Sequence, residues 1–177
     1  MASGIRHYIR SIADFPKPGM TYRDVTALFG DARGFRLAVD RMLRPYAGRE
    51  IDKVAGLEGY GFILGGAIAH RLGCGFIPVG RAGRAPGTAV AGPHCPEYAE
   101  AGVEIHEDAV EAGETVLLVD DFLARGGSVE AGIRSLERLG ADICGCSFIG
   151  DFPELHGRHR INELGFEAHV LCELREE

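Results

Sequence analysis

The stretch from Glu114 to Gly132 places the strongest constraint on the fold of this chain. Its apolar run Val116–Val119 shows no alternation of polar and apolar residues, as expected of a central parallel strand that is covered on both faces. Asp120 and Asp121 follow the run, and a glycine-containing loop comes next. The pattern therefore predicts an α/β protein in which a buried strand brings two carboxylates to an anion-binding loop.

That loop, Ala124-Arg125-Gly126-Gly127-Ser128, has the residue types that a phosphate requires. Gly126 and Gly127 let the backbone approach an anion closely, and Ser128 is expected to donate from its hydroxyl while capping the helix that starts about there. The free N–H groups and the dipole of a helix start also favour negative charge.

The two acids beside the loop indicate a ligand that is both phosphorylated and hydroxylated. Asp120 and Asp121 are expected to accept hydrogen bonds from sugar hydroxyls, or to hold Mg²⁺ directly or through water. The alternative is that they are strand-end residues that cap the following turn.

Strand-like runs alternate with helical patterns along the rest of the chain, which favours βαβ units and a central, mostly parallel sheet flanked by helices. The expected strands are Lys53–Leu57, Gly75–Val79, Thr115–Val119, Ile143–Ile149 and Glu167–Cys172. The expected helices are Ala32–Arg44, Gly61–Arg71 and Ser128–Leu139, the last ended by Gly140. With 177 residues, the chain is expected to form one domain, residues 1–177.

Composition excludes several functional classes. The formal net charge is −7 and no basic run occurs, so neither a nucleic acid nor a membrane surface is expected as a partner. With no apolar stretch of transmembrane length and no leader pattern, a cytoplasmic protein is expected. The five cysteines have no metal-finger spacing, which indicates reduced core thiols.

The Glu114–Gly132 stretch resembles the phosphoribosyl-pyrophosphate motif of type I phosphoribosyltransferases, and the rest of the chain is similar to one family among them, the adenine phosphoribosyltransferases. The further segments that carry this resemblance are Ile9–Met20, Tyr22–Thr26, Asp52–Glu58, Gly61–Gly66 and Glu97-Tyr98. The resemblance implies a single-domain type I phosphoribosyltransferase fold with a small N-terminal hood at about residues 1–30. It also implies a flexible active-site flap at about residues 80–103, and a homodimer.

The activity that the resemblance implies joins adenine to a phosphorylated sugar and releases pyrophosphate, with Mg²⁺ bridging the donor's hydroxyls and pyrophosphate. With phosphoribosyl pyrophosphate as donor, the product is AMP, as in purine salvage. Asp120 and Asp121 would hold the sugar hydroxyls and favour the positive charge that develops on the sugar. The residues 124–128 would bind its phosphate.

The resemblance gives the remaining site residues as well. Met20, Tyr22 and Arg23 would line the adenine pocket. The alternative is a purely structural role, as core residues of the hood. In the flap, Glu97 would lie near the base N7, where proton exchange helps N9 to attack, and Tyr98 would close over the site. The turn Glu58-Gly59-Tyr60 would face the pyrophosphate, with Arg81 and Arg84 as nearby cations.

Three segments depart from the pattern usual in the family. Gly59-Tyr60 stands where relatives usually have Ala-Arg, Gly80 replaces another arginine, and Arg125 replaces a threonine. Arg125 has three possible orientations: it pairs with a phosphate, turns outward into solvent, or plugs the site by binding Asp120 or Asp121.

These departures leave alternatives open. Gly59 lacks the methyl group of the usual alanine, and this absence favours a donor bulkier than ribose at the anomeric carbon, such as a ketohexose 6-phosphate with a 2-pyrophosphate. A second alternative is a non-catalytic sensor of a nucleotide or sugar pyrophosphate. A third is an inactive chain that serves as the partner in an active dimer.

Overall fold

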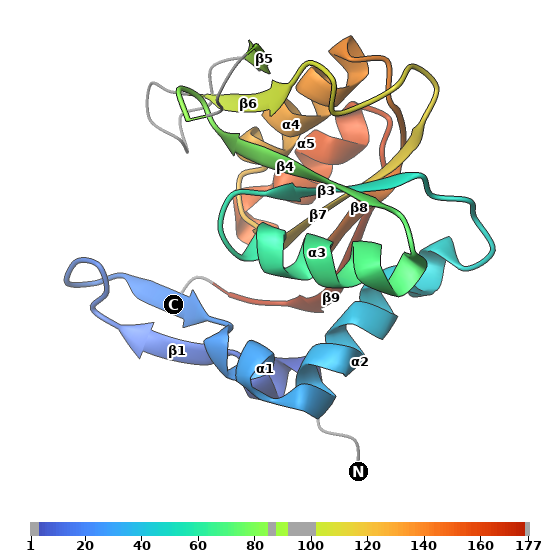
Figure 1. The fold of residues 1–177 in the computed structure, drawn as a ribbon. Helices are drawn as coiled ribbons and strands as arrows, with labels where there is room; N and C mark the ends of the chain where they lie inside the picture. The colour runs from blue at the N-terminus through green and yellow to red at the C-terminus, as the bar shows by residue number, and fades with distance from the viewer. Residues whose placement is uncertain (1–3, 85–87, 92–101, 176–177) are drawn as a thin grey trace.

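A seven-stranded sheet organises the protein, whose computed structural model describes residues 4–84, 88–91 and 102–175 (Figure 1). The strand order is β5-β6-β4-β3-β7-β8-β9. Five neighbouring strands, β4 to β9 in that order, run parallel, and β5 and β6 extend the sheet by antiparallel pairing at one edge. The strands span Lys53–Leu57 (β3), Gly75–Arg81 (β4), Ala89–Ala91 (β5), Val103–His106 (β6), Thr115–Leu123 (β7), Asp142–Asp151 (β8) and Ala168–Glu173 (β9).

Helices cover both faces of the sheet (Figure 1). They span Thr26–Gly30 (α1), Ala32–Leu43 (α2), Tyr60–Leu72 (α3), Gly127–Arg138 (α4) and Gly157–Glu163 (α5), with short 3₁₀ turns at Ile5–Tyr8, Arg44–Tyr46 and Pro153–Leu155. In β7, Leu117 packs with α2 and α3, whereas Leu118 packs with α4 and α5. Because successive strand residues point to opposite faces, an unbroken apolar run serves two cores.

A two-stranded hairpin forms the N-terminal hood, with β1 (Arg10–Ala13) antiparallel to β2 (Thr21–Asp24). In Figure 1 it lies on the side of the molecule at which β3 and β4 end. The carboxylate of Asp24, only 5% exposed, accepts hydrogen bonds from Arg10 Nε at 2.8 Å and Thr26 N at 3.0 Å. Burial alone would raise the pKa of Asp24, but these bonds hold it below its ordinary value.

The expected α/β architecture, with a mostly parallel sheet between helices, is confirmed. All five expected strands and all three expected helices are present; β3 has the expected bounds, and the others differ at one or both ends. The largest shift is in β7, which continues through both aspartates to Leu123, because its ladder with β8 extends to the pair Leu123 and Asp151. The hood hairpin, β5, β6, α1 and α5 were not expected as separate elements.

The expected cap of α4 is wrong. Gly126, at a φ of +76°, is the N-cap residue, and Ser128 lies inside the first turn. The left-handed conformation at the cap suits glycine, so the chain enters the helix two residues earlier than a serine cap requires. Much of the expected flap, residues 85–87 and 92–101, lies outside the described residues. Within the described part of the chain, no helix has the length and apolar character that crossing a bilayer demands.

The backbone of helix α3 packs closely against the sheet because three glycines line the contact. A Cβ atom on Gly56 would lie 2.3 Å from the Gly61 carbonyl oxygen, and one on Gly65 would lie 2.5 Å from the Phe76 ring. A Cβ on Gly61 would lie 2.8 Å from Asp120 Oδ1. These distances are shorter than any ordinary contact, so α3 has its position over β3 and β7 only with these glycines.

Substituting Gly56→Ala is therefore expected to destabilise the protein, because the new methyl meets backbone rather than a movable side chain. The expected loss is about 1–3 kcal/mol, as for other overpacked cores. Gly66→Ala is the control, since Gly66 lies on α3 and an added Cβ there would have nothing within 4 Å. It should be neutral or stabilising by up to about 1 kcal/mol. Urea unfolding measures both, and equal stabilities of the two variants would contradict this packing.

Candidate active site

Two carboxylates lie side by side in the C-terminal half of β7, next to the start of α3. Asp120 Oδ1 accepts the N–H of Asp121 at 2.9 Å, and Asp121 Oδ1 accepts the N–H of Phe122 at 2.8 Å. The N–H of Gly61 also donates to Asp120. Both side chains are partly buried, and these backbone donors fix their orientation.

The environment of the pair disfavours negative charge. Burial, and then the neighbouring charge of Asp121, raise the pKa of Asp120 well above its ordinary value. Burial also raises the pKa of Asp121. An aspartate with a raised pKa stabilises the fold while it is protonated, and this contribution is lost as the pH rises through the raised value. The ionised pair is therefore suited to a ligand that brings positive charge or hydrogen-bond donors.

The loop after β7 rests on α5. A Cβ on Gly157 would lie 2.1 Å from the Ala124 carbonyl oxygen. Arg160 donates to Glu130 at 2.6 Å and to the Arg125 carbonyl oxygen at 3.4 Å. These contacts hold the loop in place directly before α4, whose first residue, Gly127, is buried. The dipole of a helix start favours negative charge.

The side chain of Arg125 is exposed and forms no ion pair with a described residue. The orientation that would plug the site through Asp120 or Asp121 is therefore not adopted. The guanidinium remains available for a phosphate bound in the loop.

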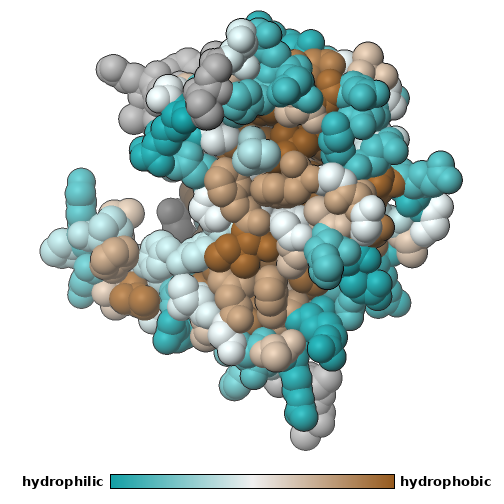
Figure 2. Space-filling view, viewed as in Figure 1, coloured by the Kyte–Doolittle hydropathy of each residue, from teal (hydrophilic) through white to brown (hydrophobic). Residues whose placement is uncertain are grey.

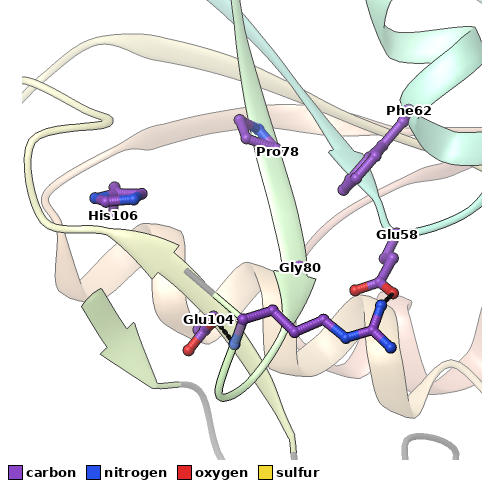
Figure 3. A pocket seen from close by; sticks show the side chains of 7 residues that line it. Glu58, Phe62, Pro78, Gly80, Glu104 and His106 are labelled. Atoms are coloured by element: carbon purple, nitrogen blue, oxygen red, sulfur yellow. Dashed lines mark hydrogen bonds and ion pairs between the residues drawn. The ribbon is translucent and has the colours of Figure 1, made fainter. Parts of the chain in front are cut away.

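The turn after β3 connects to the end of β4 through a carboxylate (Figure 3). Glu58 accepts a hydrogen bond from Arg84 Nη1 at 2.7 Å and another from the N–H of Arg81 at 2.6 Å. Glu104, 8% exposed, accepts the N–H groups of Gly83 at 2.8 Å and Arg84 at 2.6 Å. Two carboxylates thus hold the segment 81–84 against the sheet, and the charge of Arg84 is paired with Glu58.

A cavity of about 410 Å³ opens beside this turn. It is lined by Glu58, Phe62, Pro78, Gly80, Arg84, Glu104 and His106 (Figure 3). A Cβ on Gly80 would meet only Glu58 Oε2, at 3.8 Å, and one on Gly59 would meet nothing within 4 Å. The two glycines therefore leave free space at the turn where the sequence predicts the leaving group.

The hood brings aromatic side chains to the same region. Phe15 and Tyr22, 53% and 37% exposed, make an edge-to-face contact with ring centroids 5.3 Å apart. Burial raises the pKa of the Tyr22 hydroxyl, and so do a hydrogen bond with Tyr60 and the charge of Asp121. Tyr22 therefore presents a partly exposed aromatic ring on the hood strand β2.

Other predicted base-pocket residues behave differently. Met20 is half exposed on the hood. Arg23 donates from Nη2 to the Arg175 carbonyl oxygen at 2.6 Å, and from Nη1 to Ser11. Its guanidinium thus ties the hood to the end of the chain after β9.

Tyr60, which the sequence predicts to face the pyrophosphate, packs against α1. Its ring lies against Phe29 of α1, with centroids 5.2 Å apart. Sequence reasoning also missed Phe15, Phe29 and Glu104. Glu104 had a detectable signal, because it interrupts the apolar pattern of Val103 and Ile105 in a strand.

Of the predicted site residues, the structure places Asp120 and Asp121 side by side at the start of α3, with the loop after β7 and the turn at Glu58 on the same edge of the sheet. Glu97 and Tyr98 lie outside the described residues. Among the residues described, no group of three or more potential metal ligands occurs. Two carboxylates fit a Mg²⁺ ion that takes its remaining ligands from a phosphorylated substrate and water.

Known proteins are similar to this chain in sequence and in architecture. The phosphoribosyl transferase domain family matches residues 32–163. An adenine phosphoribosyltransferase from Cereibacter sphaeroides is 56% identical over 168 residues, covering 95% of this chain and 94% of that protein. One from Roseobacter denitrificans is also 56% identical over 168 residues, covering 95% and 96%.

Solved structures agree. The adenine phosphoribosyltransferase of Rhodothermus marinus superimposes with a TM-score of 0.90 at 40% identity, covering 96% of both chains. The enzyme from Saccharomyces cerevisiae, complexed with an imino-altritol bisphosphate and adenine, gives a TM-score of 0.84 at 29% identity, covering 94% of this chain and 95% of that one. With a paired-carboxylate strand, a glycine phosphate loop and full-length similarity of this degree, the chain belongs to the adenine phosphoribosyltransferase family.

Proposed function

We propose that this protein is an enzyme that transfers the phosphoribosyl group of phosphoribosyl pyrophosphate to adenine, which yields AMP and pyrophosphate and so salvages the purine. The observation that carries the proposal is the Asp120-Asp121 pair beside the glycine loop that opens α4. The names of the similar proteins support it, and so does the yeast relative that binds adenine together with a sugar-like bisphosphate.

The donor side follows from the chemistry of the loop and the pair. The sugar phosphate lies against the N–H groups at Gly126 and Gly127, with Ser128 and Arg125 as further donors. The sugar hydroxyls donate to Asp120 and Asp121. As the bond from the anomeric carbon to pyrophosphate breaks, positive charge develops on the sugar, and the adjacent carboxylates stabilise it. When bound, Mg²⁺ neutralises charge on the leaving pyrophosphate.

The acceptor side belongs to the hood. Adenine packs on Tyr22 and Met20, because flat heterocycles favour aromatic and polarizable partners. The N9 lone pair forms the new bond to the anomeric carbon, and the purine loses one proton. Glu97 is the proposed proton acceptor near N7, and Tyr98 is the proposed flap residue that closes over the base. A donor with so many charges does not cross membranes unaided, so the proposal carries a cytoplasmic location with it.

One specific observation favours a second donor. The free space at Gly59 and Gly80, next to the cavity of about 410 Å³, suits a sugar that is bulkier than ribose near the leaving group. A ketohexose 6-phosphate with a pyrophosphate at its anomeric carbon is such a donor. The same carboxylates and loop would hold it, and adenine would remain the acceptor.

The direct test incubates the purified protein with Mg²⁺, adenine and phosphoribosyl pyrophosphate, and follows AMP and pyrophosphate by mass spectrometry. Asp121→Asn should lower kcat/KM by about 100-fold or more, as losses of one stabilising group in an active site do. Asp142→Asn is the matched control and should retain full activity. This exposed aspartate is the first residue of β8, at the edge of the sheet opposite to the carboxylate pair.

Three results would redirect the assignment. Absence of AMP, together with a product from the ketohexose donor, would replace the donor. Binding of adenine or donor without turnover of either would favour a sensor. Equal activities of Asp121→Asn and Asp142→Asn would remove the carboxylate pair from the mechanism.

Arg125 provides a separate prediction for the phosphate loop. If its exposed guanidinium binds the sugar phosphate, Arg125→Ala should raise the donor KM by about tenfold or more, in line with the strength of charged hydrogen bonds. The adenine KM and kcat should stay unchanged. Arg134→Ala is the control, since the Arg134 side chain is 47% exposed and pairs with Glu130 at 3.9 Å and Glu137 at 3.5 Å on α4. A donor KM equal to that of the unmodified protein would place Arg125 in solvent.

A homodimer is also part of the proposal, and the outer face of α3 supports it. Apolar side chains gather over this helix (Figure 2), where Ile63 is 45% and Leu72 39% exposed. Such a patch commonly marks an interface. Analytical ultracentrifugation should give a dimer for the native chain and a monomer for Ile63→Asp. Asn162→Asp adds the same charge on α5 and should remain dimeric. A native monomer at micromolar concentration would contradict this.

A further inference from the structure

The phosphate loop, residues 124–128, packs directly against the start of α5. A Cβ on Gly157 would lie 2.1 Å from the Ala124 carbonyl oxygen, and one on Gly126 would lie 3.2 Å from the Gly157 carbonyl oxygen. The same Cβ on Gly126 would lie 3.5 Å from Arg160 Cδ. No side chain fits between the two backbones, so the place of α5 determines the place of the loop.

An ion pair anchors α5 to the sheet. Arg158 Nη2 lies 2.8 Å from Asp151 Oδ2, and the Asp151 side chain is only 3% exposed. Asp151 is the last residue of β8, and it pairs in the ladder with Leu123, the last residue of β7. Because a buried carboxylate is costly without a partner, this pair holds α5 at the strand end from which the phosphate loop departs.

Arg160 joins the two ends of the phosphate loop. Its Nε donates to Glu130 Oε2 at 2.6 Å, and its Nη1 donates to the Arg125 carbonyl oxygen at 3.4 Å. Arg125 lies in the loop, whereas Glu130 lies in the first turn of α4 and donates its own N–H to the Gly126 carbonyl oxygen at 2.9 Å. A guanidinium is planar, with donors in fixed directions. It therefore sets the distance between the loop and the helix start.

The charge of Glu130 makes this contact testable. Its carboxylate is 25% exposed in the first turn of α4, next to the loop that we propose for the sugar phosphate. By charge alone, a carboxylate there repels a phosphate. Removal of Glu130 thus has two opposed effects on phosphate binding: it relieves repulsion, and it releases Arg160 from the helix.

We propose that Arg160 is a positioning residue for the donor phosphate: through Glu130 and the Arg125 carbonyl oxygen it holds residues 124–128 in the geometry that binds the phosphate, without contact to the phosphate itself. This inference rests on the proposed function. It applies equally to the ribose and ketohexose donors, because both carry a phosphate at the end of the sugar away from the leaving group.

The test is a double-mutant cycle of Arg160→Met, which keeps an unbranched side chain, Glu130→Ala and the double variant. Each single variant should raise the donor KM by about tenfold, the effect of one lost charged hydrogen bond. The double variant should also give about tenfold rather than about 100-fold, because both changes remove the same bond. The adenine KM should not change.

Two further variants separate geometry from charge. Arg160→Lys keeps the charge and the aliphatic stem but lacks the planar fork, so it should also raise the donor KM. Glu137→Gln removes a negative charge from the other end of α4, where the carboxylate is 40% exposed, and should match the native chain.

The sign of the Glu130→Ala effect is decisive, since a lower donor KM would show that its charge matters and its bond does not. Additive effects in the cycle, a native donor KM for Arg160→Lys, or an equal rise in the adenine KM would also overturn the inference. The last result, with a lower thermal unfolding midpoint, is the pattern of a merely structural role.

Calorimetric titration of ribose 5-phosphate, with no adenine present, separates this inference from the proposed function. If the native chain binds ribose 5-phosphate but forms no AMP, a dissociation constant raised alike in Arg160→Met, Glu130→Ala and the double variant still supports the positioning role. If the native chain does not bind ribose 5-phosphate, or if all chains bind it equally, the role is rejected even where AMP forms.

Discussion

The close approach of two carboxylates at the end of β7 is the feature on which the rest of the site depends. Asp120 and Asp121 are adjacent and partly buried, and the pKa of each is raised. Ionisation of both carboxyl groups near neutral pH therefore destabilises the folded state. The protein offsets this cost with backbone N–H groups from Gly61, Asp121 and Phe122. A ligand rich in hydroxyl donors supplies what these groups leave unsatisfied, and this matches a sugar better than a second anion.

That arrangement in turn requires the glycines of α3 and β3. Without the close contacts at Gly56, Gly61 and Gly65, the helix start could not reach the carboxylate of Asp120. The sheet therefore fixes the donor half of the site, and α4 and α5 fix the phosphate loop through Gly157 and Arg160. The hood, which we propose binds adenine, is a thin hairpin held by the Arg10–Asp24 pair and by the hydrogen bond from Arg23 to the Arg175 carbonyl oxygen.

Much of this could be predicted from the sequence, because the informative signals are local. An unbroken apolar run, two acids and a glycine loop identify β7 and its chemistry, and helical periodicity identifies α2, α3 and α4. The hood hairpin was not predictable as strands, since β1 is exposed throughout and is held by the distant Arg10–Asp24 pair. Ser128 was assigned as a cap because serine favours caps, whereas the left-handed Gly126 takes that position. The direction of the Tyr60 ring depends on Phe29, a tertiary contact that no local pattern contains.

The most direct test of the account is a crystal structure of the protein with Mg²⁺, phosphoribosyl pyrophosphate and an adenine analogue that cannot react. The quantity to measure is the distance from each sugar hydroxyl oxygen to the carboxylate oxygens of Asp120 and Asp121. Distances of about 2.5–3.0 Å, with the purine on Tyr22, are expected. Sugar hydroxyls more than about 4 Å from both carboxylates, beyond any hydrogen bond, would contradict the assignment of these two residues as the donor-binding pair.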